Sequence, residues 1–129
     1  MQKKIGIVVQ RYGSEINGGA EYHAKLITEK MAKYYAIEVF TTTALDYITW
    51  DPHFPPGQDQ VDGIRVNRFN VHQTRDPERF GKIQDFIFNS EHSLEEEITW
   101  LDEEGPRVPA LIKELENREG DLISKHILA

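Results

Sequence analysis

The chain of 129 residues contains no cysteine. This absence excludes disulfide bonds, thiolate zinc sites, iron–sulfur clusters and a cysteine nucleophile, and it is compatible with a reducing compartment. Long apolar runs are missing as well. The run near the amino terminus covers only residues 5–9, which is too short for a signal-peptide core or for a membrane span. We therefore expect a soluble cytoplasmic protein with no membrane span.

Positive charge is also scarce. Lys and Arg number 15 against 22 Asp and Glu, which gives a net charge of −7 with His neutral. A field of this sign repels polyphosphates, so we expect no nucleic-acid partner. The five histidines are scattered, and none has a second ligand at metal-binding spacing, so no metal site is expected. Hydrophobic residues at 39% suffice for one domain with a real core, spanning residues 1–129.

The first 43 residues alternate between strand and helix patterns. Residues 5–9 form an unbroken β-branched run, typical of a parallel strand that is covered on both faces. A glycine-rich loop over 10–19 follows, and helical periodicity begins at Ala20 and continues to about Tyr35, with Asn17 as the candidate N-cap. Residues 37–43 form a second strand. This order predicts a βαβ unit.

The remainder predicts one more strand and three helices. A long loop precedes a strand over 64–71, whose polar interruptions favour an edge position. Helices are expected over 76–89, from a capping box at Ser93 to about 104, and over 108–119. We therefore predict an α/β fold with a parallel sheet in the order 3-2-1. A short fourth strand would start at Leu122, and the helices would pack on the sheet.

The glycine pair Gly18-Gly19 is the sharpest local feature. A strand-loop-helix junction directs free backbone N–H groups into a crevice, and glycines let a phosphate or sugar approach closely. Neither the G-x-G-x-x-G pattern nor a Walker A lysine is present. The alternative is a tight helix start with a structural role only, because Glu21 nearby would weaken anion binding. These residues alone leave both interpretations open.

Several segments in a fixed order carry a family resemblance: residues 10–13, 17–23, 42–50, 62–66 and 92–97. Together they resemble the N-terminal part of the retaining GT-B glycosyltransferases of the group 1 class, over about residues 3–119. The resemblance implies a Rossmann-like domain that binds the sugar acceptor. It also implies that Gly18 and Gly19 lie near the donor phosphates, with Arg11 and Glu21 as flanking positions. The implied ligand is a sugar or nucleotide-sugar, and no further cofactor is implied.

The family's donor-binding half has no counterpart in the sequence. In the family, that half carries a paired-glutamate motif with seven residues between the glutamates. Two glutamate pairs here, at 95 and 103 and at 96 and 104, have this spacing, but they lie in an acidic helix where coincidence is easy. We therefore assign no catalytic residue and expect the chain to be inactive alone. Two alternatives stay open: a non-catalytic binding or assembly module derived from such an enzyme, and an unrelated nucleotide-binding α/β domain.

Three aromatic residues are candidate acceptor contacts. Tyr12 lies beside the expected crevice, and Tyr47 and Trp50 could stack on a sugar or simply pack in the loop. The segment from Leu122 is short for a strand that should neighbour residues 5–9. We therefore expect an open strand edge at residues 5–9 and, through that edge or the tail, a homodimer.

Overall fold

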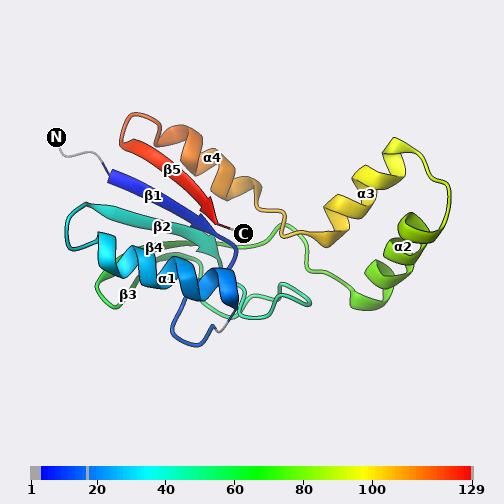
Figure 1. The fold of residues 1–129 in the computed structure, drawn as a ribbon, viewed down its shortest axis with the longest axis horizontal. Coiled ribbons are helices and arrows are strands. Elements are labelled where there is room, and N and C mark those ends of the chain that lie inside the picture. The colour runs from blue at the N-terminus through cyan, green and yellow to red at the C-terminus, as the bar shows by residue number, and fades with distance from the viewer. Residues whose placement is uncertain (1–3, 17, 129) are drawn as a thin grey trace.

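Strands and helices alternate along the chain, and the computed structural model describes residues 4–16 and 18–128. The elements are β1 (Lys4–Val9), α1 (Gly19–Met31), β2 (Ile37–Thr42), β3 (Gly57–Val61), β4 (Ile64–Phe69), α2 (Pro77–Asn89), α3 (Leu94–Glu104), α4 (Pro109–Asn117) and β5 (Leu122–Leu128). The α/β class is confirmed (Figure 1). Helix α1 begins with Gly18 as its N-cap; the expected cap, Asn17, lies outside the described residues.

The sheet has five strands in the order β3-β4-β2-β1-β5. Strands β1, β2, β4 and β5 are parallel, and β3 is antiparallel to β4. The three predicted strands are neighbours in the expected sequence, β4 beside β2 beside β1, but the order of the whole sheet is not 3-2-1, because β3 lies beyond β4 and β5 lies beyond β1. The sheet is mostly parallel, as predicted.

Strand β3 was not predicted because its sequence, GQDQV, holds one apolar residue. It forms as the hairpin partner of β4. The turn between them places Asp62 at φ 51° and Gly63 at φ 81°, the two left-handed positions that a tight two-residue hairpin requires. Strand β4 consequently lies inside the sheet, and the expectation that it forms the edge was wrong. Its polar Arg68 is 1% exposed and stacks on the Phe54 ring at 3.8 Å.

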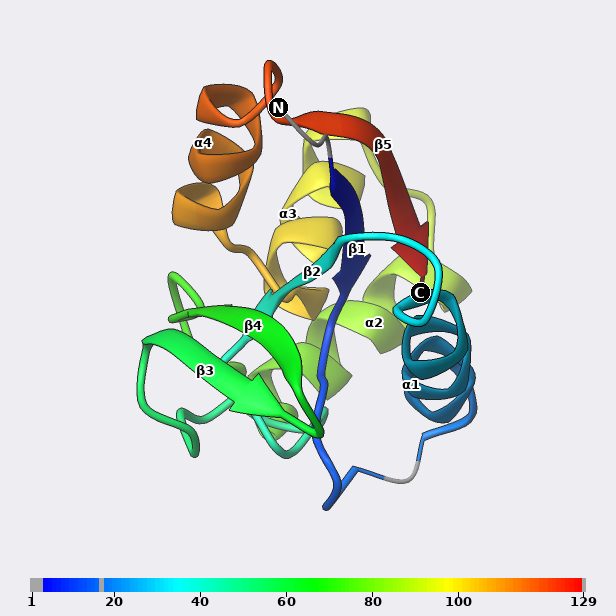
Figure 2. The ribbon, with the colours of Figure 1, turned by 90° about the vertical axis from the view of Figure 1, so that its left-hand side faces the viewer.

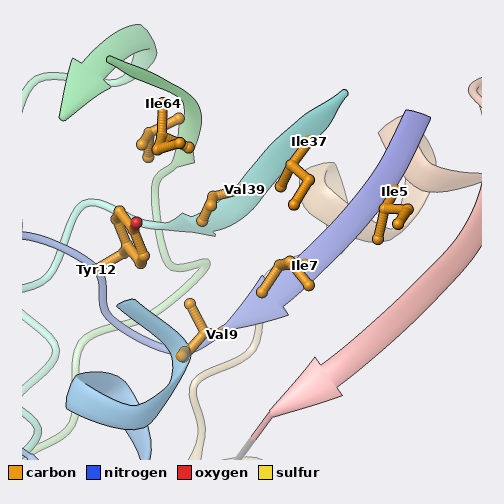
Figure 3. Close-up of a cluster of buried hydrophobic side chains, with 9 residues drawn as sticks. Ile5, Ile7, Val9, Tyr12, Ile37, Val39 and Ile64 are labelled. Carbon is orange, nitrogen blue, oxygen red and sulfur yellow. The ribbon is translucent and has the colours of Figure 1, made fainter. Parts of the chain in front are cut away.

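Helices α1 and α4 cover opposite faces of the sheet (Figure 2). On the face of α1, alternate residues of the strands join one apolar cluster with Tyr12 and Ala24; Figure 3 shows the strand residues Ile5, Ile7, Val9, Ile37, Val39 and Ile64. On the other face, Phe40 packs with Val108, the N-cap of α4, and with Leu111 of α4. The period of two along β1 and β2 thus divides the core into two layers.

The outer edge of β1 is occupied by β5 of the same chain. The two strands run parallel, with Lys4 opposite Leu122 and Val9 opposite Leu128. The expectation of an open strand edge at residues 5–9 was therefore wrong, because residues 122–128 form a strand that pairs along the length of β1. The homodimer was inferred from that open edge, and it stays a prediction without this support.

A buried carboxylate lies beneath α4. Glu38 of β2 is 1% exposed and accepts hydrogen bonds from Arg118 and, at 3.3 Å, from Asn67 Nδ2. Lys4 and Arg65 place their charged nitrogens 3.4 and 3.8 Å from its oxygens. Burial by itself raises the pKa of Glu38, but the hydrogen bonds from Arg118 and Asn67 and the nearby cations outweigh it, so the pKa lies below its ordinary value. Glu38 thereby joins β1, β2, β4 and the segment after α4.

Helices α2 and α3 form a hairpin that stands apart from the sheet (Figure 1). Asp76 caps α2 by accepting from the backbone N–H groups of Glu78 and Arg79, and Ser93 forms the predicted capping box of α3. Phe88 meets Trp100 edge-on at 5.5 Å between ring centroids, so the helices pack on each other. No helix among residues 4–16 and 18–128 is long and apolar enough to cross a membrane.

Candidate functional site

A pocket of about 450 Å³ opens at the carboxyl ends of the parallel strands. Its lining residues are Gln10, Arg11, Glu21, Tyr47, Trp50, Arg75, Glu104 and Gly105. Segments that follow β1, β2 and β4 therefore meet there with the start of α1 and the end of α3. Open α/β sheets bind ligands at this edge, and the volume is within the usual range for small molecules.

An ion pair forms the wall of the pocket beside α1. Arg11 Nε donates to Glu21 Oε1 at 3.1 Å, and Arg11 Nη1 donates to the carbonyl of Leu45 at 2.8 Å. The side chains of Arg11 and Glu21 are 10% and 11% exposed. The guanidinium also lies 5.2 Å from the centre of the Tyr47 ring. Arg11 thus ties the start of α1 to the loop after β2, and its charge is already paired.

Arg75 also lines the pocket. Its guanidinium donates to the carbonyls of Ile48, at 2.7 Å, and Tyr47, and to the carbonyl of Glu104 at 3.0 Å. Trp50 Nε1 donates to the same Glu104 carbonyl at 3.0 Å. The end of α3 is therefore fastened to the loop after β2, and the pocket has a pre-formed wall.

The aromatic residues of the pocket differ in exposure. Trp50 is buried, with 5% of its surface exposed, whereas Tyr47 is 58% exposed. Trp50 has φ 62°, which is rare for a bulky residue and costs of order 1–3 kcal/mol, so the surrounding contacts must enforce it. Asp46 accepts from Ile48 N and Thr49 Oγ1, each at 2.6 Å, and these bonds, with that of Thr49 foremost, lower the pKa of Asp46.

The structure brings together four of the seven residues singled out from the sequence: Arg11, Glu21, Tyr47 and Trp50. Tyr12 is 1% exposed and belongs to the core instead, where burial raises the pKa of its phenol to about 12. We do not retain it as an acceptor contact. Gly18 and Gly19 lie at the start of α1 and outside the pocket lining.

Gly18 has a structural reason to be glycine. A Cβ at this position would lie 2.1 Å from Glu21 Oε2 and 2.8 Å from Arg11 Nη2. The Arg11–Glu21 pair therefore occupies the space that a side chain would need. At Gly19, by contrast, a Cβ would meet nothing within 4 Å. At Gly18, the space expected to admit a phosphate is therefore occupied by the side chains of Arg11 and Glu21.

We expect the two glycines to respond oppositely to alanine. Gly18→Ala should lower the free energy of unfolding by about 1–2 kcal/mol, because alanine is a poor N-cap and its Cβ displaces the Arg11–Glu21 pair. Gly19→Ala should raise it by about 0.5 kcal/mol, since alanine favours the helix. Urea denaturation of both variants measures the difference. Equal effects at the two positions would contradict the role of the ion pair.

Sequence reasoning missed Gln10, Arg75, Glu104 and Gly105 in the pocket lining. The hydrogen bonds of Arg75 go to the main-chain carbonyls of Ile48, Glu104 and Tyr47, and a main-chain partner has no residue-type signature. Glu104 and Gly105 reach the pocket because the α2–α3 hairpin brings the end of α3 back to Trp50 and Arg75. The nearest signal was Gly105-Pro106, which marks the end of a helix.

Among residues 4–16 and 18–128, the side chains described include no group of three or more His, Asp or Glu placed to hold a metal ion. No protein-family model, no curated protein and no solved structure was found to match this chain.

Proposed function

We propose that this chain is the acceptor-side, Rossmann-like domain of a retaining GT-B glycosyltransferase of the group 1 class. The strand-end pocket is the site that binds the sugar acceptor. One observation carries the proposal: Arg11, Glu21, Tyr47 and Trp50, which the sequence singles out separately, line a single pocket where parallel strands end. The strained backbone of Trp50 adds weight, since such strain is concentrated at functional sites.

The chemistry of the pocket favours a neutral, hydroxyl-rich ligand over a phosphate. Both guanidinium groups are already engaged, Arg11 by Glu21 and Arg75 by main-chain carbonyls. A phosphate would have to compete with these partners and would meet the carboxylate of Glu21. A sugar can instead pack on the exposed ring of Tyr47 and donate hydroxyl hydrogens to Glu21, in the usual combination of aromatic surface and few polar groups.

Titration with saccharides tests the proposal. We expect a panel of neutral mono- and disaccharides to shift the amide resonances of residues 10–11 and 45–50, with a Kd on the order of 1 mM, equivalent to about 4 kcal/mol. Tyr47→Ala should weaken this binding about tenfold, which corresponds to about 1.4 kcal/mol. Tyr34→Ala is the matched control, because Tyr34 is 80% exposed and lies outside the pocket lining.

Nucleotides and nucleotide sugars supply the discriminating arm of the same titration. Micromolar binding of UDP or ADP, with no response to neutral sugars, would overturn the proposal in favour of a nucleotide-binding domain. Saccharide shifts that map away from the pocket, or that survive Tyr47→Ala, would overturn the assignment of the site. No transfer from a nucleotide sugar is expected with this chain alone, since the resemblance assigns donor binding to a second domain.

A further inference from the structure

Helix α3 has an apolar stripe that is at least half exposed. Leu94, Ile98 and Leu101 are spaced i, i+4 and i+7, so they lie on one face of the helix. They are 71%, 50% and 57% exposed. Trp100, which meets Phe88 of α2, lies on another side of α3, and Leu101 at the border of the stripe lines an open hollow with Ile87 and Phe88. None of the residues of α3 is buried.

Acidic residues border this stripe on both sides. On the helical wheel, Glu95 and Asp102 lie on one flank, and Glu97 and Glu104 lie on the other. The α2–α3 hairpin, residues 77–104, holds nine Asp and Glu against two Lys and Arg, which gives −7. The net charge of the whole chain is also −7, so the rest of the protein is neutral in sum. The excess negative charge thus lies in the hairpin that carries the stripe, and four of its acids flank the stripe directly.

We propose that the α3 stripe docks an amphipathic helix of a partner protein whose apolar face is flanked by Lys or Arg. Apolar residues of the partner cover Leu94, Ile98 and Leu101, and its basic flanks face the acids of α3. This is the arrangement by which helices with apolar seams and charged flanks select their partners. Charge complementarity sets the orientation and speeds the encounter.

The charge also argues against two other occupants. A second copy would bring together two hairpins, each with a net charge of −7, and like charges that face each other across an interface repel one another. The cytoplasmic face of a membrane carries anionic lipids, which attract basic segments and repel an acidic one. A basic amphipathic helix is the partner that gains from both the stripe and its flanks.

A designed peptide pair tests the proposal on the full chain. The probe is a labelled helical peptide of about 18 residues with Leu along one seam and Lys on both flanks; its counterpart has Glu at the same flanking positions. We expect the Lys peptide to bind in fluorescence anisotropy at micromolar concentration. Its affinity should fall about tenfold as salt rises from roughly 0.05 to 0.5 M, because surface charge is screened. The Glu peptide should bind at least tenfold more weakly.

Two variants separate the stripe from its flanks. Leu94→Gln/Ile98→Gln/Leu101→Gln should abolish binding of the Lys peptide, and these exposed positions leave the fold intact, which circular dichroism checks. Glu95→Gln/Asp102→Asn should weaken binding several-fold and reduce its salt dependence. Tyr34→Ala and Tyr35→Ala are controls on an exposed apolar surface elsewhere.

Four results would overturn the proposal. They are failure of the Lys peptide to bind, equal binding of the Glu peptide, a dimer in light scattering that the triple variant dissolves, and binding to anionic phospholipid vesicles that the triple variant abolishes. The third result would assign the stripe to a second copy and the fourth to a membrane. None of these outcomes depends on whether the strand-end pocket binds a sugar.

Discussion

Replacing Phe40 by alanine is expected to lower the free energy of unfolding by about 3–5 kcal/mol. Phe40 is fully buried on the α4 face of the sheet, in one cluster with Val108 at the N-cap of α4, Leu111 of α4 and Leu122 of β5. Its ring also packs against the bare backbone of Gly6, where a Cβ would be 3.3 Å away. Alanine would leave a cavity that a glycine backbone cannot fill. A loss of this size is a large share of a domain's total stability.

Urea denaturation measures the effect of Phe40→Ala, with Phe88→Ala as the matched control. Phe88 is the same residue type but is 64% exposed, so its truncation should cost less than about 1 kcal/mol. Similar costs for the two variants would show that α4 is not packed on the sheet through Phe40.

Removing the main cation of Glu38 should give the second large effect. Arg118→Met is expected to cost roughly 2–4 kcal/mol at neutral pH, because it leaves a buried carboxylate short of its strongest partner. The cost falls below that of an isolated buried charge since Lys4 and Arg65 remain within 3.4 and 3.8 Å. Arg107→Met is the matched control: its pair with Asp102 is exposed at 58% and 55%, so its loss should cost less than about 0.5 kcal/mol.

The effect of Arg118→Met should depend on pH. The pKa of Glu38 is lowered in the folded wild type, so its stabilising contribution is present above the unfolded value, about 4.3, and is lost as pH falls through the folded pKa. In the variant the pKa of Glu38 rises. The difference between the two proteins should therefore be largest at neutral pH and shrink as acid protonates Glu38 in both. A difference that stays constant from about pH 7 to pH 4 would contradict this account.

The parts of the fold that depend on local pattern could be predicted. The apolar runs of β1 and β2, the Pro77 helix start and the Ser93 capping box are set by adjacent residues. Strand β3 could not be predicted, because its stability comes from pairing with β4 and not from its own composition. In the sequence, the polar Glu38 interrupts the apolar pattern of β2, and its partner Arg118 lies eighty positions further along the chain. No local pattern connects the two.

The candidate site follows the same division. Arg11, Glu21, Tyr47 and Trp50 could be singled out because they lie in segments that carry the family resemblance, close to predicted strand ends. Arg75 and Glu104 could not, since their position depends on how the α2–α3 hairpin closes. Tyr12 was misassigned because sequence order places it beside Arg11, whereas the backbone turns its ring into the core.

The place of β5 beside β1 has a consequence for the order in which the chain folds. Lys4 pairs with Leu122, whereas Ile5 pairs with Ile37 on the other side of β1. Contacts between positions so distant raise the contact order and slow folding, because the connecting chain must be ordered before the pairing rewards it. While β5 has yet to dock, the N–H and C=O groups along one side of β1 are unpaired and open to other chains. The last strand of the sheet therefore decides how long a folding molecule stays prone to aggregation.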